Sequence, residues 1–225
     1  MINTLIFDLD GTLLNTLEDL KNATNFALNK FGYPERSIEE IRNFVGNGVR
    51  KLIERALLNG AENPDFEACL DTFKKNYKEI MYNHTAPYNG IFEMLKIARE
   101  KGCKIAVVSN KFDVAVKELC GRYFGSLIDI AIGESENVRK KPAPDSVFEA
   151  MKLLNSKPEN SVYIGDSDVD IETAKNAKLP CISVTWGFRD KNFLAGHGGK
   201  IFIKNPAEIF DILEKLNKET PNSII

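Results

Sequence analysis

Histidine is scarce in this sequence, which holds only His84 and His197, far apart along the chain. Two distant histidines are not enough for a zinc site or a catalytic triad built on histidine. The four cysteines are widely spaced, and none forms a Cys-x-x-Cys pair. We therefore expect reduced thiols and two surface or loop histidines, none of which takes part in chemistry.

Long apolar runs and an excess of one charge are also missing. The N-terminus, MINTLIFDLD, lacks the features of a secretory signal, and no later stretch approaches membrane-spanning length. The formal net charge is only -2, and the basic residues are scattered. The sequence thus predicts a cytoplasmic protein without a nucleic-acid or membrane partner. An anionic substrate would have to be attracted by a few local cations.

Short apolar runs that end in small or acidic residues alternate with helical patterns along most of the chain. These runs are Leu5 to Leu9, Ile105 to Ser109, Ile128 to Gly133, Val162 to Gly165, Ile182 to Thr185 and Ile201 to Ile203. Continuous apolar runs of this length are typical of parallel strands buried on both faces. The sequence therefore predicts an α/β fold in which helices cover a parallel sheet.

The stretch from Asn15 to Tyr82 differs because it shows helical periodicity only. Apolar stripes predict four helices, at about 17–31, 38–45, 49–57 and 65–82. We predict a core of residues 1–14 and 86–225, and an inserted four-helix subdomain, the cap, of residues 15–85. The tail after Lys218, which contains Pro221, is expected to be frayed.

Acidic residues follow the first apolar run, in the segment FDLDGTL at 7–13. A strand at this point delivers Asp8 and Asp10 to its carboxyl end, where ligands of open α/β sheets bind. Two carboxylates this close repel each other in a dry site, so a bound cation or a proton is needed. A hard divalent cation with oxygen ligands fits best, and Mg²⁺ is the natural choice if phosphate is also present.

A second acidic cluster follows the fourth run, in YIGDSDVD at 163–170. Asp166 stands where the strand ends and can ligate the same metal ion from a neighbouring strand. Asp170 lies one helical turn further, so its carboxylate can point back to the site. Asp168 lies between them and favours the helix N-terminus electrostatically.

Two further segments supply groups that suit phosphate. Ser109 and Asn110 follow the second run and can bind phosphate oxygens without adding negative charge. Lys141, on the proline-stiffened loop KKPAP, can offset the charge of a nucleophile and of a phosphoryl group in transfer.

Together these four segments, in this order, resemble the haloacid dehalogenase superfamily over nearly the whole chain. The resemblance implies a Rossmann-like core with a helical cap inserted after the first strand. It also implies that Asp8 is the nucleophile that becomes an aspartyl-phosphate, and that Asp10 is the general acid and then the base. In this scheme Asp8, the backbone carbonyl of Asp10 and Asp166 hold Mg²⁺ with support from Asp170, whereas Ser109 and Lys141 bind the phosphoryl group.

Asp10 also discriminates among branches of the superfamily, because the dehalogenase and phosphonate-cleaving branches carry no acid there. Its presence favours phosphoester chemistry. Thr16 departs from the serine that relatives usually carry at this position but keeps the hydroxyl.

The cap segment RNFVGNGVRKL at 42–52 looks like that of phosphoglycolate phosphatases, as does TWGFR at 185–189. Gly46, Asn47 and Gly48 form a turn whose N–H groups, with Arg50 nearby, can hold a small carboxylate. We therefore expect a phosphatase that acts on a small phosphorylated metabolite, with phosphoglycolate as the favoured substrate.

Several alternatives remain open at this level. Other small phosphomonoesters, nucleoside monophosphates and pyrophosphate are possible substrates, and a sugar-phosphate mutase of the same superfamily would use the same aspartyl-phosphate. A receiver-type phosphoaccepting module also gathers acids, a hydroxyl and a lysine around Mg²⁺, but it is about half this length and has no helical insertion. The protein is expected to be a monomer or a homodimer.

Overall fold

The computed structural model describes residues 1–136 and 138–219. The tail that the sequence predicts to be frayed lies outside these residues from position 220 on. A parallel sheet of six strands forms the core, in the order β5-β4-β1-β6-β7-β8. The strands are β1 (Thr4–Phe7), β4 (Lys104–Phe112), β5 (Ile130–Glu134), β6 (Ser161–Gly165), β7 (Cys181–Val184) and β8 (Ile201–Ile203).

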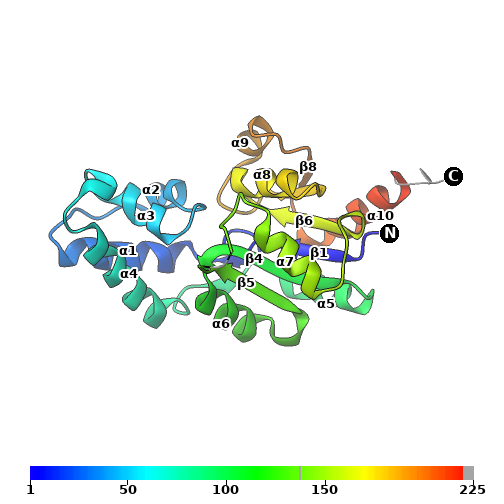
Figure 1. Ribbon diagram of the computed structural model, residues 1–225, viewed down its shortest axis with the longest axis horizontal. Helices are drawn as coiled ribbons and strands as arrows, with labels where there is room; N and C mark the ends of the chain where they lie inside the picture. The colour runs from blue at the N-terminus through cyan, green and yellow to red at the C-terminus, as the bar shows by residue number, and fades with distance from the viewer. Residues whose placement is uncertain (137, 220–225) are drawn as a thin grey trace.

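Helices cover both faces of this sheet, so the predicted α/β, Rossmann-like fold is confirmed (Figure 1). In β1, Leu5 and Phe7 pack with helices α5, α6 and α10, whereas Ile6 packs on the opposite face with α7 and α8. Successive side chains of a strand point to opposite faces, which is why a strand buried on both sides is apolar throughout. The helices of the core are α5 (Ile91–Glu100), α6 (Asp113–Tyr123), α7 (Asp145–Leu153), α8 (Asp168–Asn176), α9 (Lys191–Gly196) and α10 (Ile209–Glu219).

The remaining helices gather at one end of the molecule, at the left of Figure 1. They are α1 (Leu17–Lys30), α2 (Ile38–Phe44), α3 (Val49–Ala56) and α4 (Phe66–Ile80). Their apolar stripes meet in a shared interior in which Leu28 of α1 and Phe73 of α4 are fully buried. These helices correspond to the insertion that the periodicity of residues 15–82 predicts.

Two short strands that the sequence does not predict join this helical group to the core. Strand β2 (Leu14–Asn15) leads into α1, and β3 (Ala86–Pro87) returns from α4. They pair antiparallel, with Leu14 opposite Pro87. The predicted domain boundaries, between 14 and 15 and between 85 and 86, therefore fall at this paired linker.

Among the described residues, no helix combines the length and apolar character that crossing a membrane requires. Cys69, Cys103, Cys120 and Cys181 form no disulfide bond in the described residues.

Candidate active site

Three buried aspartates meet at the carboxyl ends of two adjacent strands. Asp8 follows β1 and Asp166 follows β6, which pair in parallel with Phe7 opposite Ile164. Carboxylate oxygens of Asp8, Asp166 and Asp170 all lie within 4.8 Å of one another. The close packing here requires glycine at position 11, because a Cβ would collide with the Asp166 carboxylate and the backbone has φ +88°.

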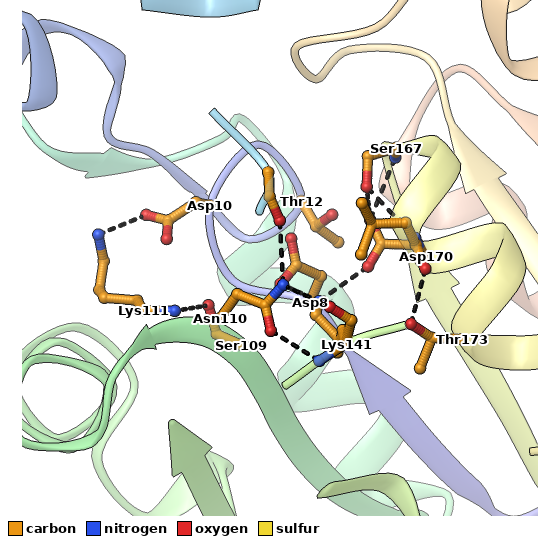
Figure 2. Close-up of polar contacts among 12 residues, drawn as sticks. Asp8, Asp10, Thr12, Ser109, Asn110, Lys111, Lys141, Ser167, Asp170 and Thr173 are labelled. Atoms are coloured by element: carbon orange, nitrogen blue, oxygen red, sulfur yellow. Dashed lines mark hydrogen bonds and ion pairs between the residues drawn. The ribbon is translucent and has the colours of Figure 1, made fainter. Parts of the chain in front are cut away.

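Lys141 is the cation of this cluster. Its Nζ donates to Oδ1 of Asp8 at 2.7 Å, to Oδ1 of Asp170 at 2.8 Å and to the hydroxyl of Tyr163 at 3.0 Å. Figure 2 shows Lys141 below Asp8, with Asp170 beside them. Burial alone lowers the pKa of Lys141, but the charges of Asp170 and Asp8 outweigh it and raise the pKa, so the ammonium stays charged.

One ammonium does not balance the buried acids. Burial raises the pKa of Asp8 to about 7, against the opposing effect of Lys141 and with the help of Asp170 and Asp10. Burial and the charges of Asp170 and Asp8 also raise the pKa of Asp166 well above its usual range. Carboxylates in this condition take up either a proton or a further cation, and their oxygen donors suit a hard divalent ion such as Mg²⁺. The residues present therefore fit the expected metal ion.

Asp170 takes a different part in the cluster from Asp8 and Asp166. Its Oδ1 accepts from Lys141 and from Tyr163, and its Oδ2 accepts from the N–H groups of Asp166 and Ser167 and from the Ser167 hydroxyl. A carboxylate has about four lone-pair positions. Because five donors already occupy Asp170, it fixes Lys141 and supplies charge, while Asp8 and Asp166 have oxygens left for a metal ion.

Ser109 and Asn110 stand at the same edge, near the end of β4. The Ser109 hydroxyl accepts from the backbone N–H of Lys111 at 3.2 Å, which leaves its own proton available for a further hydrogen bond. The Asn110 amide, in contrast, is occupied: Nδ2 donates to the carbonyls of Gly46 and Lys141, and Oδ1 accepts from Lys141 N–H. Asn110 therefore lines the site but holds the Lys141 loop and the cap turn.

Asp10 lies on the other side of Asp8 from Asp170 (Figure 2). Its Oδ1 accepts from the Thr16 hydroxyl at 2.6 Å and pairs with Lys111 Nζ at 3.0 Å. Lys111 Nζ also donates to the hydroxyl of Tyr77, in α4, at 2.9 Å. Sequence reasoning left Thr16 without a role and missed Lys111 and Tyr77. The available signal was a lysine directly after the Ser109-Asn110 turn.

The cap forms part of the wall of the site. Gly46, Gly48 and Val49 line the cavity with the core residues, and its volume is ≈ 50 Å³. Asn47 does not line it; its side chain accepts from Arg55.

The structure does not bring Arg50 to this site either. Its guanidinium pairs with Glu67 and lies over the ring of Phe66, on the exposed side of the cap. An acid and an aromatic ring on α4 thus hold it away from the cavity. The arginine that does line the cavity is Arg189, from the loop after β7, which sequence reasoning assigned no separate role. Arg189 donates to the carbonyls of Arg42, Asn43 and Val45 at the end of α2.

Known proteins are similar to this chain in sequence and fold. A family model described as haloacid dehalogenase-like hydrolase matches residues 5–184. A phosphoglycolate phosphatase of Pseudomonas syringae pv. tomato is 33% identical over 222 residues, which cover 94% of this chain and 77% of that protein. One of Aquifex aeolicus is 31% identical over 188 residues, which cover 83% of this chain and 86% of that protein.

Among solved structures, a candidate phosphoglycolate phosphatase from Lactobacillus delbrueckii subsp. bulgaricus superposes with a TM-score of 0.89 at 34% identity. The match covers 94% of this chain and 98% of that one. The family that the acidic segments suggested is thus confirmed: the chain belongs to the haloacid dehalogenase-like hydrolases.

Proposed function

We propose that this protein is a Mg²⁺-dependent phosphatase that hydrolyses small phosphomonoesters through an aspartyl-phosphate on Asp8. The observation that carries the proposal is the environment of Asp8. Its carboxylate lies at a strand end, 2.7 Å from the Lys141 ammonium and in reach of a metal ion shared with Asp166. A carboxylate attacks phosphorus well only when cations cancel the repulsion between two anions.

The first step transfers the phosphoryl group. An oxygen of Asp8 forms a bond to phosphorus, and the ester P–O bond breaks. Asp10 gives its proton to the departing alkoxide oxygen, which leaves as an alcohol. Lys141 stabilises the phosphoryl charge from a fixed position, because Asp170 and Tyr163 orient its ammonium. The Ser109 hydroxyl donates a hydrogen bond to a phosphoryl oxygen.

The second step regenerates the enzyme. Asp10, now a carboxylate, takes a proton from a water molecule, and the water oxygen attacks the phosphorus of the aspartyl-phosphate. The bond between Asp8 and phosphorus breaks, so inorganic phosphate leaves and the Asp8 carboxylate is restored. A bound Mg²⁺, held by Asp8, the backbone carbonyl of Asp10 and Asp166, would supply positive charge to the phosphoryl oxygens in both steps.

The cavity favours a small substrate. The cap turn at Gly46 and Gly48 lines it together with Asp8 and Lys141, which leaves less room for a nucleoside monophosphate than for a phosphorylated acid of a few carbons. Helix α3 begins at Val49 with its N-terminus at the cavity, and helix N-termini favour anions such as a carboxylate. The names of the curated relatives point the same way, so phosphoglycolate is the proposed substrate.

A panel of phosphate esters tests this proposal. Purified protein with Mg²⁺ is expected to release inorganic phosphate from phosphoglycolate with a kcat/KM at least tenfold above that for nucleoside monophosphates, pyrophosphate and sugar phosphates. Isomerised sugar phosphate without phosphate release would instead identify a mutase. A preference for nucleotides would contradict the argument from cavity size.

Arg189, in the core, and Arg50, in the cap, give a matched comparison. Arg189→Met is expected to lower kcat/KM by about tenfold to a hundredfold, because hydrogen bonds from a charged group, about 1.5–3 kcal/mol each, hold α2 against the core. Arg50→Met is expected to stay within twofold of the wild type, because its partner is Glu67 on the exposed side of the cap. Steady-state kinetics on phosphoglycolate measures kcat/KM of both variants. A loss of more than twofold in Arg50→Met would show that Arg50 contributes to substrate binding.

We also keep a cytoplasmic location, a monomeric or homodimeric state and the absence of a nucleic-acid or membrane partner as parts of this proposal. Cell fractionation and sedimentation analysis test the first two.

A further inference from the structure

Lys111 is a buried lysine that the proposed chemistry does not use. Its side chain is 3% exposed, and it lies near the end of β4. Buried lysines are rare unless they are paired, because removing an ammonium from water costs several kcal/mol. The position of its partners should therefore explain why Lys111 is there.

These partners come from separate parts of the chain. Nζ of Lys111 lies 3.0 Å from Oδ1 of Asp10, in the core, and donates to the hydroxyl of Tyr77, in the cap, at 2.9 Å. It also lies 4.6 Å from the centre of the Tyr77 ring. Burial alone lowers the pKa of Lys111, but the charge of Asp10 and the contact with Tyr77 raise it overall, so the ammonium remains charged.

One oxygen of Asp10 is held by two donors. Oδ1 accepts from Thr16 and from Lys111, and within residues 1–136 and 138–219 no donor reaches Oδ2. With Oδ1 fixed, the torsion of the carboxyl group is fixed as well. Oδ2 is left to exchange a proton with the leaving group and with water, which requires a defined position.

Tyr77 has a fixed position of its own. Its ring stacks on Phe73 of the same helix, with centroids 5.5 Å apart, and meets the edge of Phe112 in β4 at 6.1 Å. The ring is fully buried between the cap and the core. The hydroxyl therefore reaches Lys111 only when α4 is seated against β4.

We propose that Lys111 is a positioning residue that orients Asp10 for proton transfer and, through Tyr77, makes that orientation depend on the seated cap. The inference rests on the proposed function, in which Asp10 exchanges the proton. Lys111 lines the cavity, but in this scheme it acts through Asp10 and not on the reacting atoms.

A double-mutant cycle tests the proposal. Lys111→Met keeps the length of the side chain and removes its charge, and it is examined alone and together with Asp10→Asn. Two substrates are compared: phosphoglycolate, whose alkoxide leaving group needs a proton, and p-nitrophenyl phosphate, whose phenolate leaving group does not.

In single turnover, Lys111→Met is expected to slow transfer of the phosphoryl group from phosphoglycolate by about tenfold to a hundredfold, and transfer from p-nitrophenyl phosphate at least fivefold less, because only the first leaving group needs a proton. Steady-state kcat should fall for both substrates while KM stays within twofold of the wild type, because Asp10 also activates water in the shared second step. In the Asp10→Asn background the same substitution should cause no further loss. Tyr77→Phe, which keeps the aromatic packing, should shift kcat in the same direction by about threefold to tenfold. Lys117→Met, an exposed lysine on α6 paired with Asp113, serves as the control and should match the wild type.

Several results would overturn the proposal. Losses that multiply in the double variant, a rise in KM at constant kcat, or equal losses of the single-turnover transfer rate for the two substrates would show that Lys111 binds substrate or only supports the fold. If Lys111→Met does not fold, the same cycle with Tyr77→Phe decides the question. Failure of the proposed function would look different, because the wild type would then release no phosphate from either substrate.

Discussion

Asp8→Asn is expected to lower kcat for phosphoglycolate by about four orders of magnitude or more. An amide cannot form an acyl phosphate, although its oxygen can still accept the hydrogen bond from Lys141 that Asp8 accepts at 2.7 Å. The substitution therefore removes the nucleophile and disturbs the surroundings little. Rapid acid quenching with ³²P-labelled substrate should trap phosphate on the wild-type protein, releasable by hydroxylamine, and none on Asp8→Asn.

Asp168→Asn is the matched control for this experiment. Asp168 is an acid at the start of α8 that lies outside the cavity lined by Asp8, so its substitution should change kcat less than threefold. Asp8→Asn with wild-type turnover would remove the covalent mechanism. Trapped phosphate on Asp8→Asn would show that another residue is the acceptor.

Removal of Mg²⁺ is expected to abolish turnover and to lower thermal stability. Asp8 and Asp166 have raised pKa values because burial and neighbouring acids oppose their charge, and a shared divalent cation relieves that cost. At free Mg²⁺ about a hundredfold above its Kd, binding contributes about 2.7 kcal/mol, which corresponds to a rise in Tm of roughly 5–10 °C. Thermal unfolding in EDTA and in Mg²⁺ measures this shift without reference to activity.

Asp166→Asn tests whether Asp166 is a ligand of the Mg²⁺ ion that raises the Tm. It is expected to reduce the Tm shift to less than about 2 °C. The amide can keep both present contacts of Asp166, since its oxygen can accept from Phe188 N–H and its nitrogen can donate to the Thr12 hydroxyl. Glu172→Gln, which changes an exposed acid on α8, should leave the full shift. A full shift in Asp166→Asn would mean that Mg²⁺ binds elsewhere.

The sheet was predictable because its strands are buried on both faces. Runs such as Ile105 to Ser109 need apolar residues at every position, and their carboxyl ends then carry the acids and hydroxyls of the site. The strand ends were less predictable: β4 continues to Phe112 through an irregular register after Val108, where residues 109–111 are polar. The pairing of β2 with β3 has no periodic signal, because each strand has only two residues.

Within the site, residues carried by adjacent strand ends were predictable, and contacts across the cap were not. Asp8 and Asp166 must be close if β1 and β6 are neighbours, whereas the meeting of Lys111 with Tyr77 depends on how α4 seats on β4. The two arginines make the same point. Arg50 is near the cap turn in sequence but turns toward Glu67, and Arg189 is distant in sequence but reaches that turn.

The pairing of β2 with β3 also bears on how such a molecule can diversify. Leu14 and Pro87 are direct neighbours in the ladder, so the chain leaves the core and re-enters it across one interstrand spacing, about 5 Å. Segments whose ends lie together can be exchanged without stretching the host that receives them. The helices between these two residues can therefore be replaced by another insert whose ends lie equally close together. Such a replacement would change the residues that select the substrate and leave the strand ends that carry the acids in place.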